Sequence, residues 1–279
     1  MYTFKNCLPL LTISALSLGG CGGSSSFTQQ TNVFGVTIKA TAATPTEKVL
    51  HAANILAEYL DNNEDGIADN TAVVERLKNQ KATLLMAKNA ADMPKNAYLT
   101  HGDSGQDLYA AETHINGAAQ GKFDASLEEI LHLITHVGYA SVYPGVFGEE
   151  AGSAIADAMD TARGGHFTSI PKPYPTGAWY TYDDTTCSYS CMVTEYTYWA
   201  LTSILGAQSY SGRLESIQHE WKLNTNEKVM NQDTAVYTIL TDAQYALATN
   251  LPDGKYAAGT FEIINTTSSV ATLPTKSTK

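Results

Sequence analysis

The stretch "SLEEILHLITHVGY" (Ser126–Tyr139) has the pattern of an amphipathic helix. At about 100° per residue, its apolar side chains fall on one side of a helix. The opposite side gathers four side chains of metal-binding types: Glu128, Glu129, His132 and His136. Histidines and carboxylates one turn apart converge on one point, where they can share a zinc ion. We therefore expect a metal-binding helix here, and the prediction of the fold depends on it.

The composition indicates one globular domain with a substantial core, because 43% of the 279 residues are hydrophobic and only 16% are charged. The formal charge of −11 argues against a nucleic-acid partner, since phosphate binding needs clustered Lys and Arg. No interior run is long and apolar enough to be expected to span a bilayer.

The N-terminus predicts export. Residues 1–20 combine Lys5, an apolar stretch and small residues, which is typical of a signal peptide. The ending "LGGC" resembles the bacterial lipobox, so we expect a lipoprotein signal peptide over residues 1–20 and a lipid on Cys21. Residues 21–40 are then the lipidated cysteine and a flexible tether. Gly22 after the cysteine favours the outer membrane of a bacterial cell envelope, contacted through the lipid anchor.

The remaining cysteines agree with export, because only Cys187 and Cys191 are left once Cys7 is removed with the signal and Cys21 carries lipid. In an oxidising compartment this spacing predicts one local disulfide. Two zinc-binding thiolates are the alternative, but no second Cys/His pair stands at the spacing of a structural zinc site.

The chain predicts an α+β fold in which a small sheet packs on a mainly helical domain. A helix is expected over residues 44–60, and a helical pattern resumes at 71–80. Residues 82–89 and 106–115 have the composition of strands, and from Phe123 onward the chain is mostly helical. The predicted divisions are a helix–calcium loop–helix unit at 41–80, a main domain at 81–258 and a disordered tail at 259–279.

The loop "DNNEDGIADN" between the first two helices predicts a calcium site. Calcium takes six to eight oxygen ligands, and a tight loop supplies them from alternate residues around a glycine. The expected ligands are Asp61, Asn63, Asp65, the carbonyl of Ile67, and Asp69. Position 12 of the loop is Ala72 instead of the bidentate acid of an EF-hand, so the loop is more similar to those of thrombospondin type 3 and dockerin modules. The ion would be structural.

A further candidate metal ligand, an acidic residue, lies in an apolar segment downstream of the predicted metal-binding helix. Glu195 lies within "CMVTEYTYWALTSILGA" (Cys191–Ala207), where an unpartnered carboxylate is costly. A metal helix followed by a glutamate helix resembles the gluzincin zinc metallopeptidases, in particular the anthrax lethal factor-like catalytic domains. The resemblance covers roughly residues 123–245. It implies a zincin-like domain in which Glu129 is the catalytic base, His132 and Glu195 are metal ligands, and Tyr189 steadies the oxyanion.

The sequence departs from the family at the first ligand position, where Glu128 replaces a histidine. Three interpretations stay open. Glu128 binds the metal itself, or His136 supplies the missing imidazole one turn later, or the site is inactive. Glutamate is an acceptable zinc ligand, and carboxylate-rich sets also suit manganese or iron.

We therefore expect a lipid-anchored, extracytoplasmic, metal-dependent hydrolase that cleaves peptide or protein substrates with metal-activated water. The strand predicted near residues 106–115 would align an extended peptide. The alternative is a catalytically inactive, zincin-like lipoprotein, stabilised by calcium, that acts as a binding module.

Overall fold

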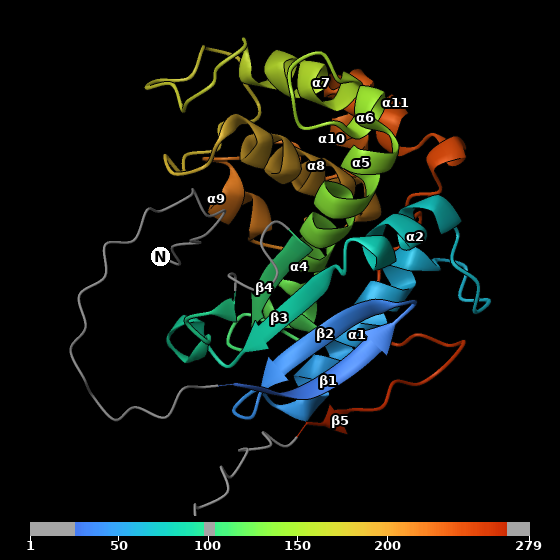
Figure 1. The fold of residues 1–279 in the computed structure, drawn as a ribbon. Coiled ribbons are helices and arrows are strands. Elements are labelled where there is room, and N and C mark those ends of the chain that lie inside the picture. The colour runs from blue at the N-terminus through green and yellow to red at the C-terminus, as the bar shows by residue number, and fades with distance from the viewer. Residues whose placement is uncertain (1–25, 98–103, 267–279) are drawn as a thin grey trace, which may run out of the picture.

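The computed structural model describes residues 26–97 and 104–266, and Figure 1 shows its α+β architecture. Residues 1–20, Cys21 and residues 267–279 lie outside these ranges, so the predicted signal peptide, lipidation and most of the tail are untested. No helix in the described part of the chain has the length and apolar character needed to cross a membrane.

A mixed sheet forms one half of the molecule, with strand order β4-β3-β2-β1-β5. Its strands are β1 (Phe27–Val33), β2 (Val36–Thr41), β3 (Thr83–Ala87), β4 (Gly105–Tyr109) and β5 (Ile264–Asn265). The turn Phe34–Gly35 joins β1 and β2, and both residues have positive φ (49° and 91°). Such a turn matches the twist of an antiparallel hairpin. β3 pairs in parallel with β2 on one side and with β4 on the other.

Two predicted boundaries were wrong at this sheet. The flexible tether was expected over residues 21–40, but the chain forms a strand from Phe27 onward, and β1 and β2 pair over most of their length. The tail expected from residue 259 contains β5, which pairs with β1 at Gln29 and Gln30. Strands at residues 82–89 and 106–115 were confirmed, the second ending earlier, at Tyr109.

Helices cover the sheet and build the other half of the molecule (Figure 1). They are α1 (Thr46–Leu60), α2 (Thr71–Asn79), α4 (Ser126–Leu133), η4 (Ile134–Tyr139), α5 (Ala140–Val142), α6 (Pro144–Phe147), α7 (Ala154–Arg163), α8 (Tyr189–Leu205), α9 (Arg213–Ile217), α10 (Asn226–Gln232) and α11 (Thr234–Leu240), with short 3₁₀ turns η1 (Ala90–Asp92), η3 (Gly117–Gln120) and η5 (Ala243–Tyr245). α1 packs on β1 and β2, whereas α4 packs on β4 and on α8. α4 therefore lies between the sheet and the helical half, and one continuous apolar core joins the two.

Candidate metal centre

Two helices that pack against each other supply the site. α4 buries Leu127, Ile130 and Leu131, which leaves Glu128 and His132 together on its other face. α8 is apolar around nearly its whole circumference and is buried from Cys191 to Ser203. Glu195 lies within that buried stretch, so its carboxylate has to find partners inside the protein.

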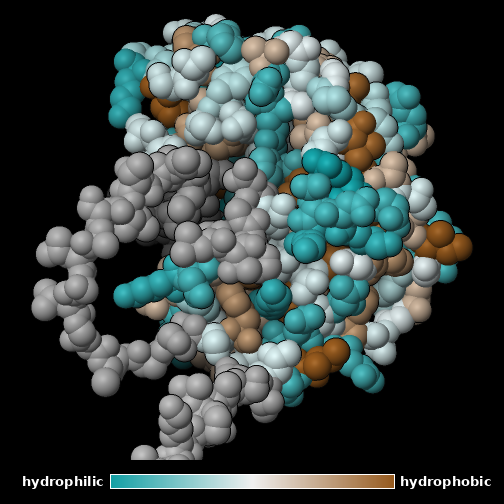
Figure 2. Space-filling model, viewed as in Figure 1, coloured by the Kyte–Doolittle hydropathy of each residue, from teal (hydrophilic) through white to brown (hydrophobic). Residues whose placement is uncertain are grey.

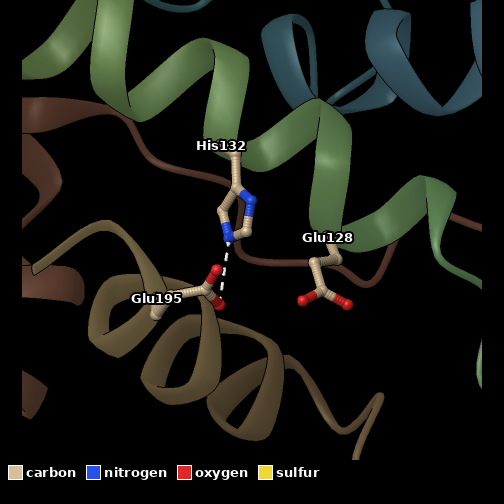
Figure 3. Close-up of side chains that lie close together, drawn as sticks. All are labelled: Glu128, His132 and Glu195. Atoms are coloured by element: carbon tan, nitrogen blue, oxygen red, sulfur yellow. Dashed lines mark ion pairs between the residues drawn. The ribbon is translucent and has the colours of Figure 1, made fainter. Parts of the chain in front are cut away.

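Glu128, His132 and Glu195 converge in the core, as Figure 3 shows. One ligand atom from each lies within 4.8 Å of the others, and the three residues are only 7%, 4% and 7% exposed. His132 Nε2 lies 3.6 Å from Glu195 Oε2, and this buried nitrogen has no hydrogen-bond partner in the described structure. One imidazole and two carboxylates are a donor set that fits zinc, manganese or iron.

The electrostatics of this group favour a bound cation. Burial raises the pKa of Glu128 well above its usual range, and the nearby carboxylates of Glu195 and Glu129 raise it further. Burial also raises the pKa of Glu195 to about 7, although His132 opposes the rise. The pKa of His132 is lowered by burial, which favours the neutral imidazole that metals bind. A cation would offset the cost of burying these carboxylates together.

Two tyrosine hydroxyls act on the carboxylates. Tyr182 lowers the pKa of Glu195, and Tyr198 lowers the pKa of Glu128, so each opposes the rise that burial causes. The Tyr198 ring also packs edge-on against His132, with 5.5 Å between the ring centroids. The Tyr198 hydroxyl accepts from Gln208 and Arg213, so a polar chain supports this side of the group. Such supporting contacts orient ligands and tune the site.

Glu129 lies on the other side of the imidazole. Its Oε2 is 3.6 Å from His132 Nδ1 and accepts a 2.6 Å hydrogen bond from Gln106 of β4. Burial raises the pKa of Glu129 well above its usual range, and Asp107 and Glu112 add to the rise. Glu129 therefore joins α4 to the edge strand β4 and is outside the group formed by Glu128, His132 and Glu195.

His136 points away from the group. Its side chain is 43% exposed, and its Nδ1 lies 2.6 Å from Glu149 Oε2. The helix changes from α to π geometry at Ile134, so His136 no longer follows the α-helical spacing from His132. Of the two residues considered for the missing ligand position, Glu128 is the one next to His132 and Glu195.

Tyr189 also lies in a different cluster. Its hydroxyl donates to Asp160 at 3.0 Å, and its ring contacts the imidazole of His166. The tyrosine that lowers the pKa of Glu195 is Tyr182. The oxyanion role expected of Tyr189 stays a prediction, but the described contacts do not bring it to the metal group.

The predicted calcium loop forms a tight turn between α1 and α2. Asp61 is fully buried, and its carboxylate accepts from the backbone of Asp65 and Gly66. Similar bonds run from Asp65 to Asn63 Oδ1, from Ile67 to Asp65 Oδ1 and from Asn62 to Asp69 Oδ2. The expected side-chain ligands thus face into one loop, and calcium binding there stays a prediction.

The predicted disulfide was confirmed between Cys187 and Cys191, at the start of α8. A further set of potential ligands, Asp183, His219 and Glu220, lies where the segment before α8 meets the end of α9. Asp183 and His219 are exposed, so water hydrates these groups without a metal.

No protein-family model, curated protein or solved structure matches the chain. The resemblance to gluzincins therefore rests on the motif residues alone. Sequence reasoning identified Glu128, His132 and Glu195 but missed Gln106, Tyr182 and Tyr198. Tyr198 follows Glu195 by three residues and so shares its helix face, a signal that was available; Tyr182 comes from an irregular segment that gives none.

Proposed function

We propose that the chain is a metal-dependent hydrolase acting on peptide bonds, held at the bacterial envelope by a lipid on Cys21. The observation that carries the proposal is the buried, unpartnered Nε2 of His132, which faces Glu195 with Glu128 beside it. An orphaned imidazole nitrogen between two buried carboxylates is costly unless a cation joins them. The disulfide supports an oxidising, extracytoplasmic compartment.

In this proposal Glu128, His132 and Glu195 hold zinc, manganese or iron. A bound metal would polarise the substrate carbonyl and lower the pKa of water. Tyr182 and Tyr198 favour the charged forms of the two ligand carboxylates, and Gln106 orients Glu129. Glu129 is assigned the proton-acceptor role that the resemblance to gluzincins implies, because it adjoins His132 without belonging to the ligand set. It lies on the Nδ1 side of the ring, opposite the proposed ligand atom Nε2, so this role requires its side chain to turn towards the metal.

The second candidate is a metal-containing binding lipoprotein without catalytic activity. Two observations favour it: the ligands are almost fully buried, and Glu129 is engaged by Gln106. Both limit the access of a substrate and the freedom of the base.

Elemental analysis of the purified protein, with a peptidase assay on fluorescent casein, tests these proposals. Wild type, Glu129→Gln and His136→Ala should each contain about one equivalent of zinc, manganese or iron, and His132→Ala should lose it. Glu129→Gln should keep the metal and lose hydrolysis. Metal without hydrolysis in the wild type would favour the binding lipoprotein. Equal metal content in wild type and His132→Ala would overturn the metal centre.

A further inference from the structure

A cavity opens one helical turn beyond the metal group. Its volume is about 790 Å³, within the range of small-molecule sites, and it lies between the end of α2, the η4–α5 helix and the segment 148–153. His136 lines it, whereas Glu128, His132 and Glu195 do not. Figure 2 shows a broad hydrophilic patch on this face of the molecule, over α2.

Arg76, in the last turn of α2, gives this cavity a positive charge. The arginine is partly buried, and its Nε is enclosed by protein without a hydrogen-bond partner. Its guanidinium forms no ion pair within the described ranges. Because Nε is closed to solvent, a ligand in the cavity would contact Arg76 through the terminal N–H groups of its guanidinium.

The acidic residues of the wall are already engaged or hydrated. Glu149 Oε2 lies 2.6 Å from His136 Nδ1, and Glu149 Oε1 accepts from Thr194 at 2.7 Å. Glu150 is exposed to water. Arg76 is therefore the cation of the cavity wall that has no ion-pair partner within the described ranges.

We propose that this cavity binds a carboxylate group, which Arg76 recognises through its planar fork of N–H donors. Arginine binds carboxylates in this two-pronged manner better than any other side chain. The carboxylate comes either from an acidic side chain of a peptide or from its free C-terminus.

The position of the cavity connects it to substrate choice, a step that rests on the proposed function. His132 and His136 are separated by one turn, about 6 Å along the helix. That length equals about two residues of an extended peptide. A peptide that reached both the candidate metal group and this cavity would thus carry its carboxylate only a few residues from the bond that is cleaved.

Ligand-observed NMR titrations of the EDTA-treated protein test the proposal without the metal. The probes are the acetylated and amidated tetrapeptides Ala-Ala-Glu-Ala, Ala-Ala-Gln-Ala and Ala-Ala-Lys-Ala, and acetyl-trialanine with a free or an amidated C-terminus. The glutamate peptide should bind about tenfold more tightly than the glutamine peptide, or free trialanine about tenfold more tightly than its amide. The pair that shows the difference identifies the source of the carboxylate.

Arg76→Met should abolish this preference, and Lys78→Met is the matched control. Lys78 is an exposed cation on the same helix, already paired with Glu75, so its loss should leave the preference intact. Arg76→Met should melt within a few degrees of wild type, because the Arg76 side chain has no hydrogen-bond or ion-pair partner among residues 26–97 and 104–266. Equal binding of acid and amide probes, tighter binding of the lysine peptide, or a preference that survives Arg76→Met would overturn the proposal. Since the metal is absent, these outcomes are independent of whether the chain hydrolyses peptides.

Discussion

At the scale of single residues, Glu195 shows why the metal group is unusual. An ionised carboxylate inside an apolar helix is disfavoured, and Glu128 and Glu129 lie close enough to repel it. His132 and Tyr182 lower the pKa of Glu195, but they offset only part of the rise that burial causes. The chain therefore keeps several mutually repelling acids in its core. The packing of α8 by itself does not require these acids.

The pKa of Glu195 predicts how the stability of the metal-free protein depends on pH. It is about 7 in the folded protein and 4.5 ordinarily, so the folded state holds a proton that the unfolded chain releases. Stability from this group is complete below the unfolded value and is lost as pH rises through 7. Between about pH 5.5 and about pH 7.5, the free energy of unfolding should fall by about 1–2 kcal/mol on this account.

Urea denaturation of the EDTA-treated protein at both pH values measures this loss. Glu195→Gln cannot titrate and should show a loss smaller by that amount. An identical pH dependence in wild type and variant would contradict the prediction. Metal binding should follow the opposite trend, because the ligands must be deprotonated, so metal affinity should rise with pH.

The residues of the candidate site were predictable to different degrees. Glu128 and His132 share a helix face by spacing, and Glu195 is conspicuous as a charge in an apolar run. The different direction of His136 was not predictable, because it follows from a change from α to π geometry within the helix, which the spacing of the residues does not indicate. Gln106 and Tyr182 approach the site from a strand and an irregular segment, and only the tertiary fold brings them there.

At the scale of elements, the loop between α1 and α2 carries the prediction of calcium binding. Gly66 has a φ of 86°, which permits the sharp turn around Asp61. We expect calcium to raise the melting temperature, since saturation at about a hundred times the dissociation constant contributes about 2.7 kcal/mol. Asp65→Ala should remove this response, because it deletes an exposed ligand without touching the buried Asp61.

Thermal melting in EDTA and in calcium checks this expectation. Asp253→Ala is the control, since Asp253 is an exposed acid paired with Lys255 outside the loop. An unchanged calcium response in Asp65→Ala would contradict calcium binding at this loop, as would the absence of any response in the wild type.

Among the elements, long periodic segments were predicted well and short polar strands were not. The helix at residues 126–139 and the buried strand β3 follow from apolar spacing alone. β1 reads "FTQQTNV", which is polar enough to resemble a linker. Its strand conformation depends on pairing with β2 and with β5 from the far end of the chain, and no local pattern reports that pairing.

At the scale of the whole molecule, residues 249–256, here called the C-terminal strap, lie against α1 and the loop that follows it. Asn62 Oδ1 accepts from the backbone of Thr249 and Asn250, and its Nδ2 donates to Asn250. Asn62→Ala should lower the free energy of unfolding by about 3 kcal/mol, since it removes these three bonds and each contributes about 1 kcal/mol. Urea denaturation measures the change. Asn79→Ala, at an exposed position at the end of α2, should change it by less than about 0.5 kcal/mol, and equal effects would contradict the role of the strap.

The pairing of β5 with β1 sets an order of events during biosynthesis. Thr266 bonds to Phe27 across 239 residues, so the outer edge of β1 stays open until the chain has been made as far as residue 266. An open strand edge is a site where nascent chains stick to one another, and closing so long a loop is slow. Under the proposed export, a chain threaded across a membrane before it folds would pair β1 with β5 only after residue 266 has crossed. The topology thus suits a polypeptide that stays unfolded until β5 has passed.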